Sequence, residues 1–260
     1  MALWIGGEDE RLEEAGRLLR AWGWPVAGRA KGPLSPGDHV LLPPAPLPEV
    51  PSFLGEGPFT LWGGALQPEA ERELFARGWR YVAYGEDSGF RRVNGILTAE
   101  SFLVWSMAEE KMSLRERRWA VLGLGYTGRP LVERILSWGG EVWGITGRRE
   151  AMGDLQAKGA RILSWEAFPP PGLDLGAVVN TAPARLLTEA QLRDLEGIPF
   201  FDLASAPYGL DEGEAARWGL PYRRLPALPA RVLTRSAARL VAEAVARLWP
   251  EGGGRPWERS

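Results

Sequence analysis

The stretch that decides the fold is Trp119-Ala120-Val121-Leu122-Gly123-Leu124-Gly125-Tyr126-Thr127-Gly128. An apolar run ends in a G-x-G-x-x-G turn, and the helical pattern Pro130–Trp138 follows, as in the first half of a strand–helix–strand unit. The first glycine permits the tight turn, the second lets backbone N–H groups approach a pyrophosphate, and the third allows close helix–strand packing. The amino end of the helix then favours the phosphate charge. The segment therefore predicts a dinucleotide-binding sheet; the alternative is a glycine-rich turn without a ligand.

Further strand and helix patterns continue this alternation after the glycine turn. The predicted strands are Glu141–Ile145, Ala160–Leu163, Ala177–Asn180, Pro199–Leu203 and Tyr222–Leu225, and the predicted helices are Glu150–Lys158 and Thr234–Leu248. Before the turn, we expect strands at Ala2–Ile5, Asp38–Leu42, Phe59–Trp62 and Trp79–Tyr84, with helices at Glu10–Trp22 and Pro68–Ala76. Both halves alternate as a parallel α/β sheet does.

The longest helical pattern in the first half runs from Thr98 to about Arg117, with Thr98 as its expected N-cap. Its length suggests a bridge between two domains, although it could equally be one more packing helix. The fold class we predict is α/β, with two Rossmann-like domains that have parallel sheets and are joined by a long helix. The expected divisions are 1–97 (a substrate or catalytic-like α/β domain), 98–117 (the linking helix), 118–231 (the nucleotide-binding domain), 232–250 (a C-terminal helix that returns to the first domain) and 251–260 (a frayed tail).

The residues at the end of the second strand of the later sheet decide whether the site accepts a ribose 2′-hydroxyl or a 2′-phosphate. An NAD site usually offers Asp or Glu there, but this chain has Thr146-Gly147-Arg148-Arg149. A guanidinium pairs with a 2′-phosphate, whereas a carboxylate would repel it. We therefore predict NADP rather than NAD. The competing interpretation is a chance surface pair in a chain with 28 arginines.

Two other strand ends should reach the same edge of the sheet, because ligands in open parallel sheets bind outside the carboxyl ends of the strands. They are Asn180-Thr181-Ala182-Pro183 and Asp202-Leu203-Ala204-Ser205. Small and hydroxylated residues there would let a nicotinamide ribose lie against the backbone, although the same residues are common in ordinary turns. The predicted cofactor residues are Gly123, Leu124, Gly125, Tyr126, Thr127, Gly128, Thr146, Arg148, Arg149, Asn180, Thr181, Ala182, Pro183 and Ala204.

A candidate substrate side precedes the predicted long helix. Arg91-Arg92-Val93-Asn94 leads into Thr98-Ala99-Glu100, and a helix amino end flanked by such residues can hold a carboxylate. We expect Arg92, Thr98 and Ser205 to bind substrate, with Asn94 and Glu100 as catalytic residues and Glu100 as the proton acceptor if it is desolvated. A capped helix beside solvated arginines is an equal alternative. His39, inside an apolar strand pattern, is interpreted as a core or cleft-edge residue rather than a base.

Composition narrows the classes of function. The chain has 260 residues, a formal charge of −2, no cysteine and one histidine, which excludes thiolate chemistry and multi-histidine metal centres, so we expect no metal. The near-neutral charge argues against nucleic-acid or membrane binding, and without an apolar run long enough to span a membrane we expect a cytoplasmic protein. Twenty-two prolines and few thermolabile side chains suit a thermostable protein, though genome composition could give the same bias.

Several stretches together resemble the family of the dipicolinate synthase A subunit over most of the chain. They are Gly6-Gly7 with Asp9 and Arg11, Asn94 with Thr98-Ala99-Glu100, the Gly123–Gly128 loop, Asn180-Thr181-Ala182-Pro183, Asp202-Leu203-Ala204-Ser205-Ala206-Pro207 and Leu225-Pro226-Ala227-Leu228-Pro229-Ala230-Arg231-Val232. The chain departs from the family pattern at Tyr208, Ala230 and Ala238, where the family tends to have glycine.

The resemblance implies two Rossmann-like domains with the cofactor between them and NADP-dependent oxidation of a cyclic dicarboxylate of the dihydrodipicolinate type. It also implies a flavoprotein-like second subunit; whether the chain forms a homo-oligomer is left open. Two alternatives stand beside it. One is an NAD(P)-binding sensor or non-catalytic partner subunit. The other is a D-2-hydroxyacid-dehydrogenase-like enzyme, although this chain has no histidine after His39.

Overall fold

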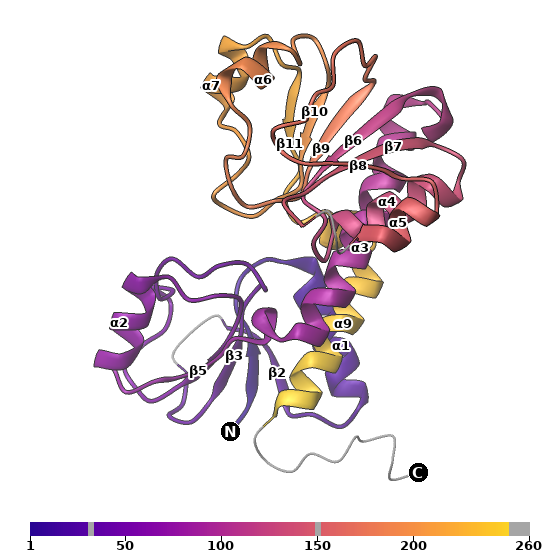
Figure 1. The fold of residues 1–260 in the computed structure, drawn as a ribbon. Coiled ribbons are helices and arrows are strands. Elements are labelled where there is room, and N and C mark those ends of the chain that lie inside the picture. The colour runs from indigo at the N-terminus through magenta and orange to yellow at the C-terminus, as the bar shows by residue number, and fades with distance from the viewer. Residues whose placement is uncertain (31–33, 149–151, 250–260) are drawn as a thin grey trace. The chain divides into compact units, whose positions relative to one another are not determined.

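The computed structural model describes residues 1–30, 34–148 and 152–249. Its contacts divide the chain into two compact units. Unit 1 comprises Met1–Asn94 together with the chain from Pro229 onward, and unit 2 comprises Gly95–Leu228. The fold class predicted from the sequence is confirmed, because each unit is built on a parallel sheet with helices (Figure 1).

Unit 1 contains a five-stranded parallel sheet in the order β2-β1-β3-β4-β5. The strands are β1 (Leu3–Ile5), β2 (Val26–Arg29), β3 (His39–Leu41), β4 (Thr60–Trp62) and β5 (Arg80–Val82). Its other elements are α1 (Glu10–Ala21), α2 (Pro68–Ala76), the 3-10 turn η1 (Tyr84–Glu86) and α8 (Leu228–Val232), which starts on the last residue of unit 2. The sequence did not predict β2, because Pro25 and Gly28 interrupt its apolar pattern, a composition that edge strands tolerate.

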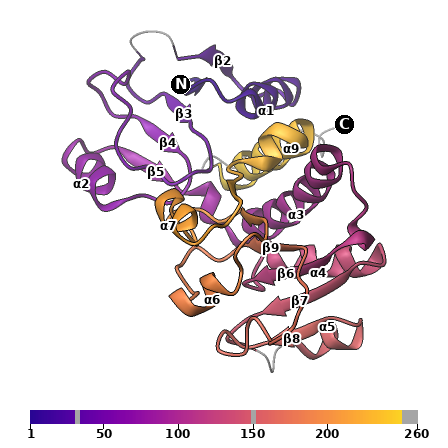
Figure 2. The ribbon, with the colours of Figure 1, turned by 90° about the horizontal axis from the view of Figure 1, so that it is seen from above.

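The C-terminal helix α9 (Thr234–Leu248) packs along α1 within unit 1, and Figures 1 and 2 show the two helices side by side. Their contact is close because the buried face of α9 is rich in small residues, among them Ala237, Ala238 and Ala242. On the sheet side, Gly16 brings α1 against Ile5 of β1: a Cβ at Gly16 would lie 3.1 Å from the Ile5 side chain. Unit 1 is therefore assembled from the two ends of the chain.

Unit 2 contains a six-stranded parallel sheet in the order β11-β10-β9-β6-β7-β8. The strands are β6 (Arg118–Leu122), β7 (Glu141–Ile145), β8 (Arg161–Leu163), β9 (Ala177–Asn180), β10 (Phe200–Asp202) and β11 (Tyr222–Arg224). Its helices are α4 (Gly128–Ser137), α5 (Gly153–Ala157), α6 (Glu189–Arg193) and α7 (Glu212–Arg217), with a 3-10 turn η2 (Leu114–Glu116) before β6. All five strands expected after the glycine turn are present, and the short helices α6 and α7 were not predicted.

One helix boundary was wrong. The long helix α3 runs over Ser88–Glu110, not from Thr98 to Arg117, and the short turn η2 follows it. The side chain of Asp87 starts the helix by accepting a 2.8 Å hydrogen bond from the N–H of Phe90. The weak helix formers Gly89, Asn94 and Gly95 hid this start in the sequence. Thr98 is therefore an interior helix residue, and no helix amino end lies there.

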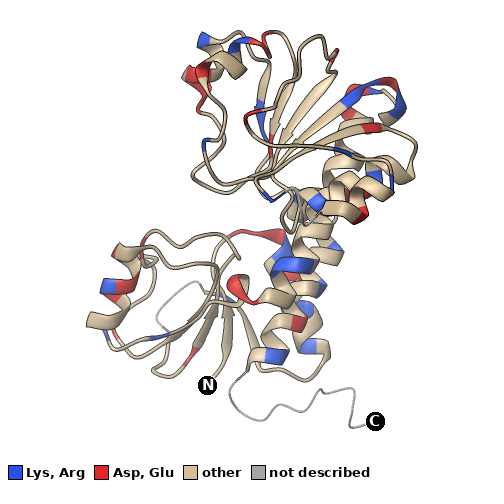
Figure 3. Cartoon of the chain, in the orientation of Figure 1, with Lys and Arg blue, Asp and Glu red and all other residues tan. Residues whose placement is uncertain are grey.

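Aromatic side chains pack the unit 2 part of α3 against the six-stranded sheet. Phe102 packs on Phe201 and on Trp119, and Trp105 packs on Phe201, so this helix covers one face of the six-stranded sheet. A core of Leu122, Trp143, Phe168, Phe200 and other apolar side chains covers the opposite face. Charged residues of both signs are distributed mainly along helices and loops (Figure 3). None of the helices within the described ranges is both long and apolar enough to cross a membrane.

Candidate functional site

The carboxyl edge of the sheet in unit 2 brings together the strand ends that carry most of the predicted cofactor residues. Leu122 pairs laterally with Asn180, Asn180 with Asp202, and Asp202 with Arg224, so four strands end in register. The chain moves outward from β6 to β7 and β8, then returns to the other side of β6 for β9. The order in which strands are added therefore reverses between β6 and β9, and open α/β sheets bind ligands at such a point.

The glycine loop has the geometry that its sequence predicted. Gly123 follows β6 with φ of +84°, a left-handed conformation that glycine adopts without strain. A Cβ at Gly128 would collide with the carbonyl oxygen of Gly123 and lie 2.7 Å from the Thr181 hydroxyl, so the third glycine is needed for packing. No described atom lies within 4 Å of the Cβ position at Gly125. The middle glycine therefore leaves open space beside the backbone.

The amino end of α4 lies directly after this loop, since the helix begins at Gly128. Thr127 occupies the N-cap position but its side chain makes no capping hydrogen bond. Tyr126 is 47% exposed, and the helix is long enough to carry a dipole. A Cβ at Gly95 of α3 would collide with the Tyr126 carbonyl, so Gly95 lets α3 approach the loop. An anion at this end would meet backbone N–H groups and a favourable dipole.

Thr181 fixes the glycine loop rather than pointing away from it. Its hydroxyl lies 2.9 Å from the carbonyl oxygen of Gly123 and 3.2 Å from that of Leu122, and can donate to either. The Ala182 Cβ lies where a larger residue at Gly123 would clash. Thr181 and Ala182 therefore lie at the edge of the sheet that carries the glycine loop, and their contacts with a bound cofactor stay a prediction.

Asp202 organises the two remaining strand ends. Its carboxylate is fully buried and accepts hydrogen bonds on Oδ1 from the Asn180 amide (3.0 Å) and the Ala204 N–H (3.0 Å). Oδ2 accepts from the Gly209 N–H (2.8 Å) and lies 3.1 Å from the Tyr222 hydroxyl. Four donors around one buried carboxylate compensate for its lost hydration. Asp202 was not among the predicted site residues, although an acidic residue at the end of an apolar strand was a signal for it.

Asn180 completes this network. Its amide also donates to the Ala182 carbonyl (3.0 Å), and its Oδ1 accepts from the Ala182 N–H (3.1 Å). A Cβ at Gly209 would lie 2.5 Å from the Asn180 amide nitrogen, which explains a glycine there. The Asn180 side chain is thus committed to the loops, and it is 1% exposed.

The ribose-side residues lie at the end of β7. The Thr146 hydroxyl accepts a 3.1 Å hydrogen bond from the N–H of Arg148, and this tight turn leaves the Arg148 side chain exposed. The N–H of Gly123 donates to the Ile145 carbonyl, so the glycine loop and the β7 end are adjacent. Arg149 lies outside the described residues.

The predicted substrate residues on α3 lie in a different setting from the one expected. Arg92 and Asn94 lie within the first two turns of the helix, with Arg92 exposed, and Thr98 is half-buried. The Glu100 carboxylate forms a 2.5 Å ion pair with Arg134 of α4, and its side chain is 38% exposed. Glu100 is therefore neither desolvated nor unpaired, and the condition under which it was expected to act as a base is not met. Ser205 is exposed after β10.

His39 is a core residue, as the apolar pattern indicated. It is 5% exposed, its Nδ1 accepts a 3.0 Å hydrogen bond from the Trp62 indole N–H, and its ring stacks on Trp249 with centroids 4.2 Å apart. Trp24 adds an edge contact to Trp249. The histidine therefore packs in unit 1 between indole rings.

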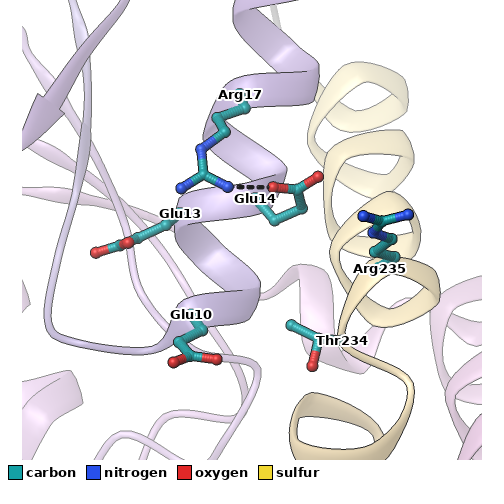
Figure 4. Close-up of a pocket in the computed structure, with 6 residues that line it drawn as sticks. All are labelled: Glu10, Glu13, Glu14, Arg17, Thr234 and Arg235. Atoms are coloured by element: carbon teal, nitrogen blue, oxygen red, sulfur yellow. Dashed lines mark hydrogen bonds and ion pairs between the residues drawn. The ribbon is translucent and has the colours of Figure 1, made fainter.

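A cavity of about 630 Å³ lies between α1 and α9 in unit 1 (Figure 4). Glu10, Glu13 and Glu14 line it, opposite Thr234 and Arg235. Glu14 pairs with Arg17 at 2.5 Å, and Glu13 pairs with Arg29. Arg17 also lines the cavity, so its charged groups are of both signs and two of its three carboxylates are paired. Among the described residues no group of three His, Asp or Glu side chains is arranged to hold a metal ion.

Comparisons with known proteins give structural similarity alone. No protein-family model and no curated protein matches the chain. The structure of the dipicolinate synthase A subunit from Bacillus halodurans superposes with a TM-score of 0.79 at 20% identity, over 96% of this chain and 98% of that one. The corresponding dipicolinate synthase structure from Bacillus subtilis gives 0.78 at 19% identity, over 100% and 98%. A D-isomer-specific 2-hydroxyacid dehydrogenase from Lactobacillus delbrueckii ssp. bulgaricus, in its NAD complexed form, gives 0.54 at 9% identity, over 95% and 96%.

These similarities cover nearly the whole chain and confirm the predicted resemblance at the level of fold. The chain has a Rossmann-like dehydrogenase fold that resembles the A subunit of dipicolinate synthase. At such identities the fold does not determine the substrate or the residues that act on it.

Proposed function

We propose that the chain is an NADP-dependent oxidoreductase that removes a hydride from a small cyclic dicarboxylate of the dihydrodipicolinate type. The observation that carries the proposal is the glycine loop. Gly128 allows close packing, and Gly125 leaves open space beside the backbone. The amino end of α4 has no side-chain cap and lies where the strand order reverses between β6 and β9. This combination fits a pyrophosphate.

The preference for NADP over NAD is supported by the end of β7. Thr146 turns the chain so that Arg148 is exposed beside the loop, and Thr146-Gly147-Arg148 offers no carboxylate for a ribose 2′-hydroxyl. A guanidinium there favours a 2′-phosphate. When bound, NADP supplies the hydride acceptor; the chain's own residues bind and orient it.

The substrate class is supported by the similarity to the two dipicolinate synthase structures. The catalytic assignments of Asn94 and Glu100 remain predictions of the sequence analysis, as does the flavoprotein-like second subunit. For Glu100 the ion pair with Arg134 favours a structural role. The 2-hydroxyacid-dehydrogenase alternative is supported by structural similarity to several D-lactate and D-2-hydroxyacid dehydrogenases, but the chain has no histidine beyond His39 to transfer the proton.

Fluorescence titration of the intact protein with NADPH and with NADH tests the proposal. We expect NADPH to bind at least about tenfold more tightly than NADH, equivalent to about 1.4 kcal/mol. The Arg148→Ala variant should lose this preference while NADH affinity stays unchanged. Arg193→Ala, an arginine that stacks on Trp218 elsewhere in unit 2, is the matched control.

Three results would contradict parts of the proposal. No binding of either nucleotide would overturn the dinucleotide site itself. Equal affinity for both would overturn the 2′-phosphate assignment. Tight NADPH binding without turnover of any cyclic dicarboxylate would favour the non-catalytic alternative.

A further inference from the structure

Arg224 ends β11 on the same edge as the candidate cofactor site. It pairs laterally with Asp202, which pairs with Asn180, so its Cα lies one strand spacing from Asp202, about 4.8 Å. Side chains alternate along a strand, which places Arg224 on the same face of the sheet as Tyr222. The guanidinium therefore stands beside the Asp202 network and not on the face that α3 covers.

The guanidinium of Arg224 lies beside the side chains of Tyr208 and Tyr222, and Glu212 acts on it from beyond ion-pair distance. The Arg224 Cζ lies 3.9 Å from the centroid of the Tyr208 ring, a cation–π contact. Within the described part of the chain no carboxylate lies within ion-pair distance of it, and its Nε is buried without a hydrogen-bond partner. Most arginines in this unit for which a polar contact is described pair with a carboxylate, as Arg129, Arg134 and Arg185 do.

The loop that carries Tyr208 is fixed by Asp202. The carboxylate accepts from the N–H groups of Ala204 and Gly209, the two ends of the segment that contains Ser205 and Tyr208. Burial raises the pKa of Tyr222 to about 12, with further contributions from the neighbouring charges, so its hydroxyl stays protonated as a donor beside Asp202. Tyr208 and Arg224 are thus presented by a rigid scaffold.

We infer that Arg224, stacked on Tyr208 of the loop that also carries the exposed Ser205, binds a carboxylate group of the substrate at the carboxyl end of β11. A planar guanidinium pairs bidentately with a carboxylate, and contact with an aromatic ring leaves its edge open for that pairing. This replaces the amino end of a helix at Thr98, which the structure does not contain. The assignment rests on the proposed function, because it names the part of the site that selects the substrate.

Arg223 provides a matched control on the same strand. It lies on the opposite face, where it pairs with Glu109 of α3 at 3.8 Å and lies over the Trp105 ring. Arg223 and Arg224 have the same chemistry and neighbouring backbones. Only their faces and partners differ, so a general loss of positive charge affects both equally.

The test is calorimetric titration with pyridine-2,6-dicarboxylate, in the presence and absence of NADPH, on wild type, Arg224→Gln and Arg223→Gln. The neutral pyridine-2,6-dicarboxamide serves as the ligand control. We expect Arg224→Gln to weaken dicarboxylate binding at least about tenfold, the loss of one charged hydrogen-bonded pair. Arg223→Gln should stay within about twofold of wild type, and both variants should bind NADPH as wild type does.

Three further variants guard against a folding artefact. Arg224→Lys keeps the charge without the planar fork, and we expect it to recover part of the lost affinity but not all of it. Tyr208→Phe keeps the ring and should bind within about twofold of wild type, whereas Tyr208→Ala should bind more weakly. Thermal melting of each variant separates loss of binding from loss of structure.

The inference is overturned if Arg224→Gln binds the dicarboxylate like wild type, if Arg223→Gln loses as much, or if Arg224→Gln loses NADPH affinity to the same extent. It is also overturned if wild type binds NADPH but no dicarboxylate. If wild type binds no nucleotide, the proposed function fails. The titration without nucleotide then still decides the role of Arg224, since loss of dicarboxylate binding in Arg224→Gln alone would support it.

Discussion

The two units have the same sheet architecture but opposite chemistry at the carboxyl ends of their strands. In unit 1 a glycine pair, Gly6-Gly7, follows the first strand, as Gly123–Gly128 follows β6 in unit 2. Gly6 and Gly7 help to line a cavity of about 280 Å³ whose other residues, Pro43, Pro46 and Phe53 among them, are apolar. Beside Gly123–Gly128, Thr181 contacts the loop, and the next strand ends carry Asn180 and Asp202. Polar groups that converge on a strand end, rather than glycines alone, distinguish a nucleotide edge.

In unit 1, loops pack tightly on one another at the carboxyl ends of the strands. A Cβ at Gly64 would collide with the Ala45 carbonyl, and the Tyr81 hydroxyl donates to the Gly64 carbonyl at 2.9 Å. The Tyr84 hydroxyl donates to the Leu42 carbonyl at 2.7 Å. Glycines here allow loops to pack on one another, whereas Gly125 leaves open space. The two units therefore differ in whether such a glycine lets loops pack together or leaves room for a ligand beside the backbone.

Gly128→Ala should have the largest effect, because its Cβ would collide with the Gly123 carbonyl. We expect a loss of about 3 kcal/mol in the free energy of unfolding, typical of an overpacked contact that the backbone cannot relieve. NADPH affinity should fall at least about a hundredfold, or about 2.8 kcal/mol, because the loop must move. Urea denaturation and fluorescence titration measure the two quantities.

Gly125→Ala separates packing from access. No described atom would contact the new methyl group, so stability should change by no more than about 0.5 kcal/mol. NADPH affinity should nevertheless fall, since the methyl group would occupy the space beside the backbone. Gly55→Ala, at an open position in unit 1, is the control that should change neither. If Gly125→Ala binds NADPH as tightly as wild type, the loop does not hold a pyrophosphate.

Asp202→Asn should come next in size. One buried carboxylate oxygen becomes an NH₂ group that faces donors, so we expect a loss of about 2 kcal/mol in stability. Because Asp202 holds Ala204 and Gly209, nucleotide affinity should fall as well. Chemical denaturation gives the first quantity and NADPH titration the second. A variant that loses stability but binds NADPH normally would show that these loops do not form the site.

Asp38→Asn is the matched substitution in unit 1, where a buried carboxylate precedes β3. Burial raises the pKa of Asp38, but hydrogen bonds from the Ala2 and Ser35 N–H groups and the Trp4 indole outweigh it and hold the pKa below 3.8. A lowered pKa stabilises the folded state above pH 3.8, and this contribution is lost as the pH falls through the lower, folded-state pKa. The stability difference between wild type and Asp38→Asn should therefore be constant at neutral pH and shrink below about pH 4. NADPH affinity should not change.

Local sequence patterns predicted the parts of the site that depend on neighbouring residues. The glycine loop, the Thr146 turn and the ends of β9 and β10 follow from strand and turn signals within a few positions. Asp202 was missed because its partners come from three segments, and Asn180 and Tyr222 are 22 and 20 residues away. The start of α3 was misplaced because propensity at Gly95 suggested a break, whereas close packing against the Tyr126 carbonyl explains that glycine.

Glu100→Gln should have the smallest effect and tests the remaining sequence prediction for α3. The ion pair with Arg134 is partly exposed, so its loss should cost no more than about 1 kcal/mol of stability. Arg134→Gln should cost a similar amount, and the double variant should be no worse than the sum of the two, which a double-mutant cycle measures. If the only role of Glu100 is to pair with Arg134, NADP-dependent oxidation of a cyclic dicarboxylate by Glu100→Gln should stay within about twofold of wild type. A hundredfold fall in turnover with unchanged stability would instead make Glu100 the proton acceptor, because loss of a general base costs about that much.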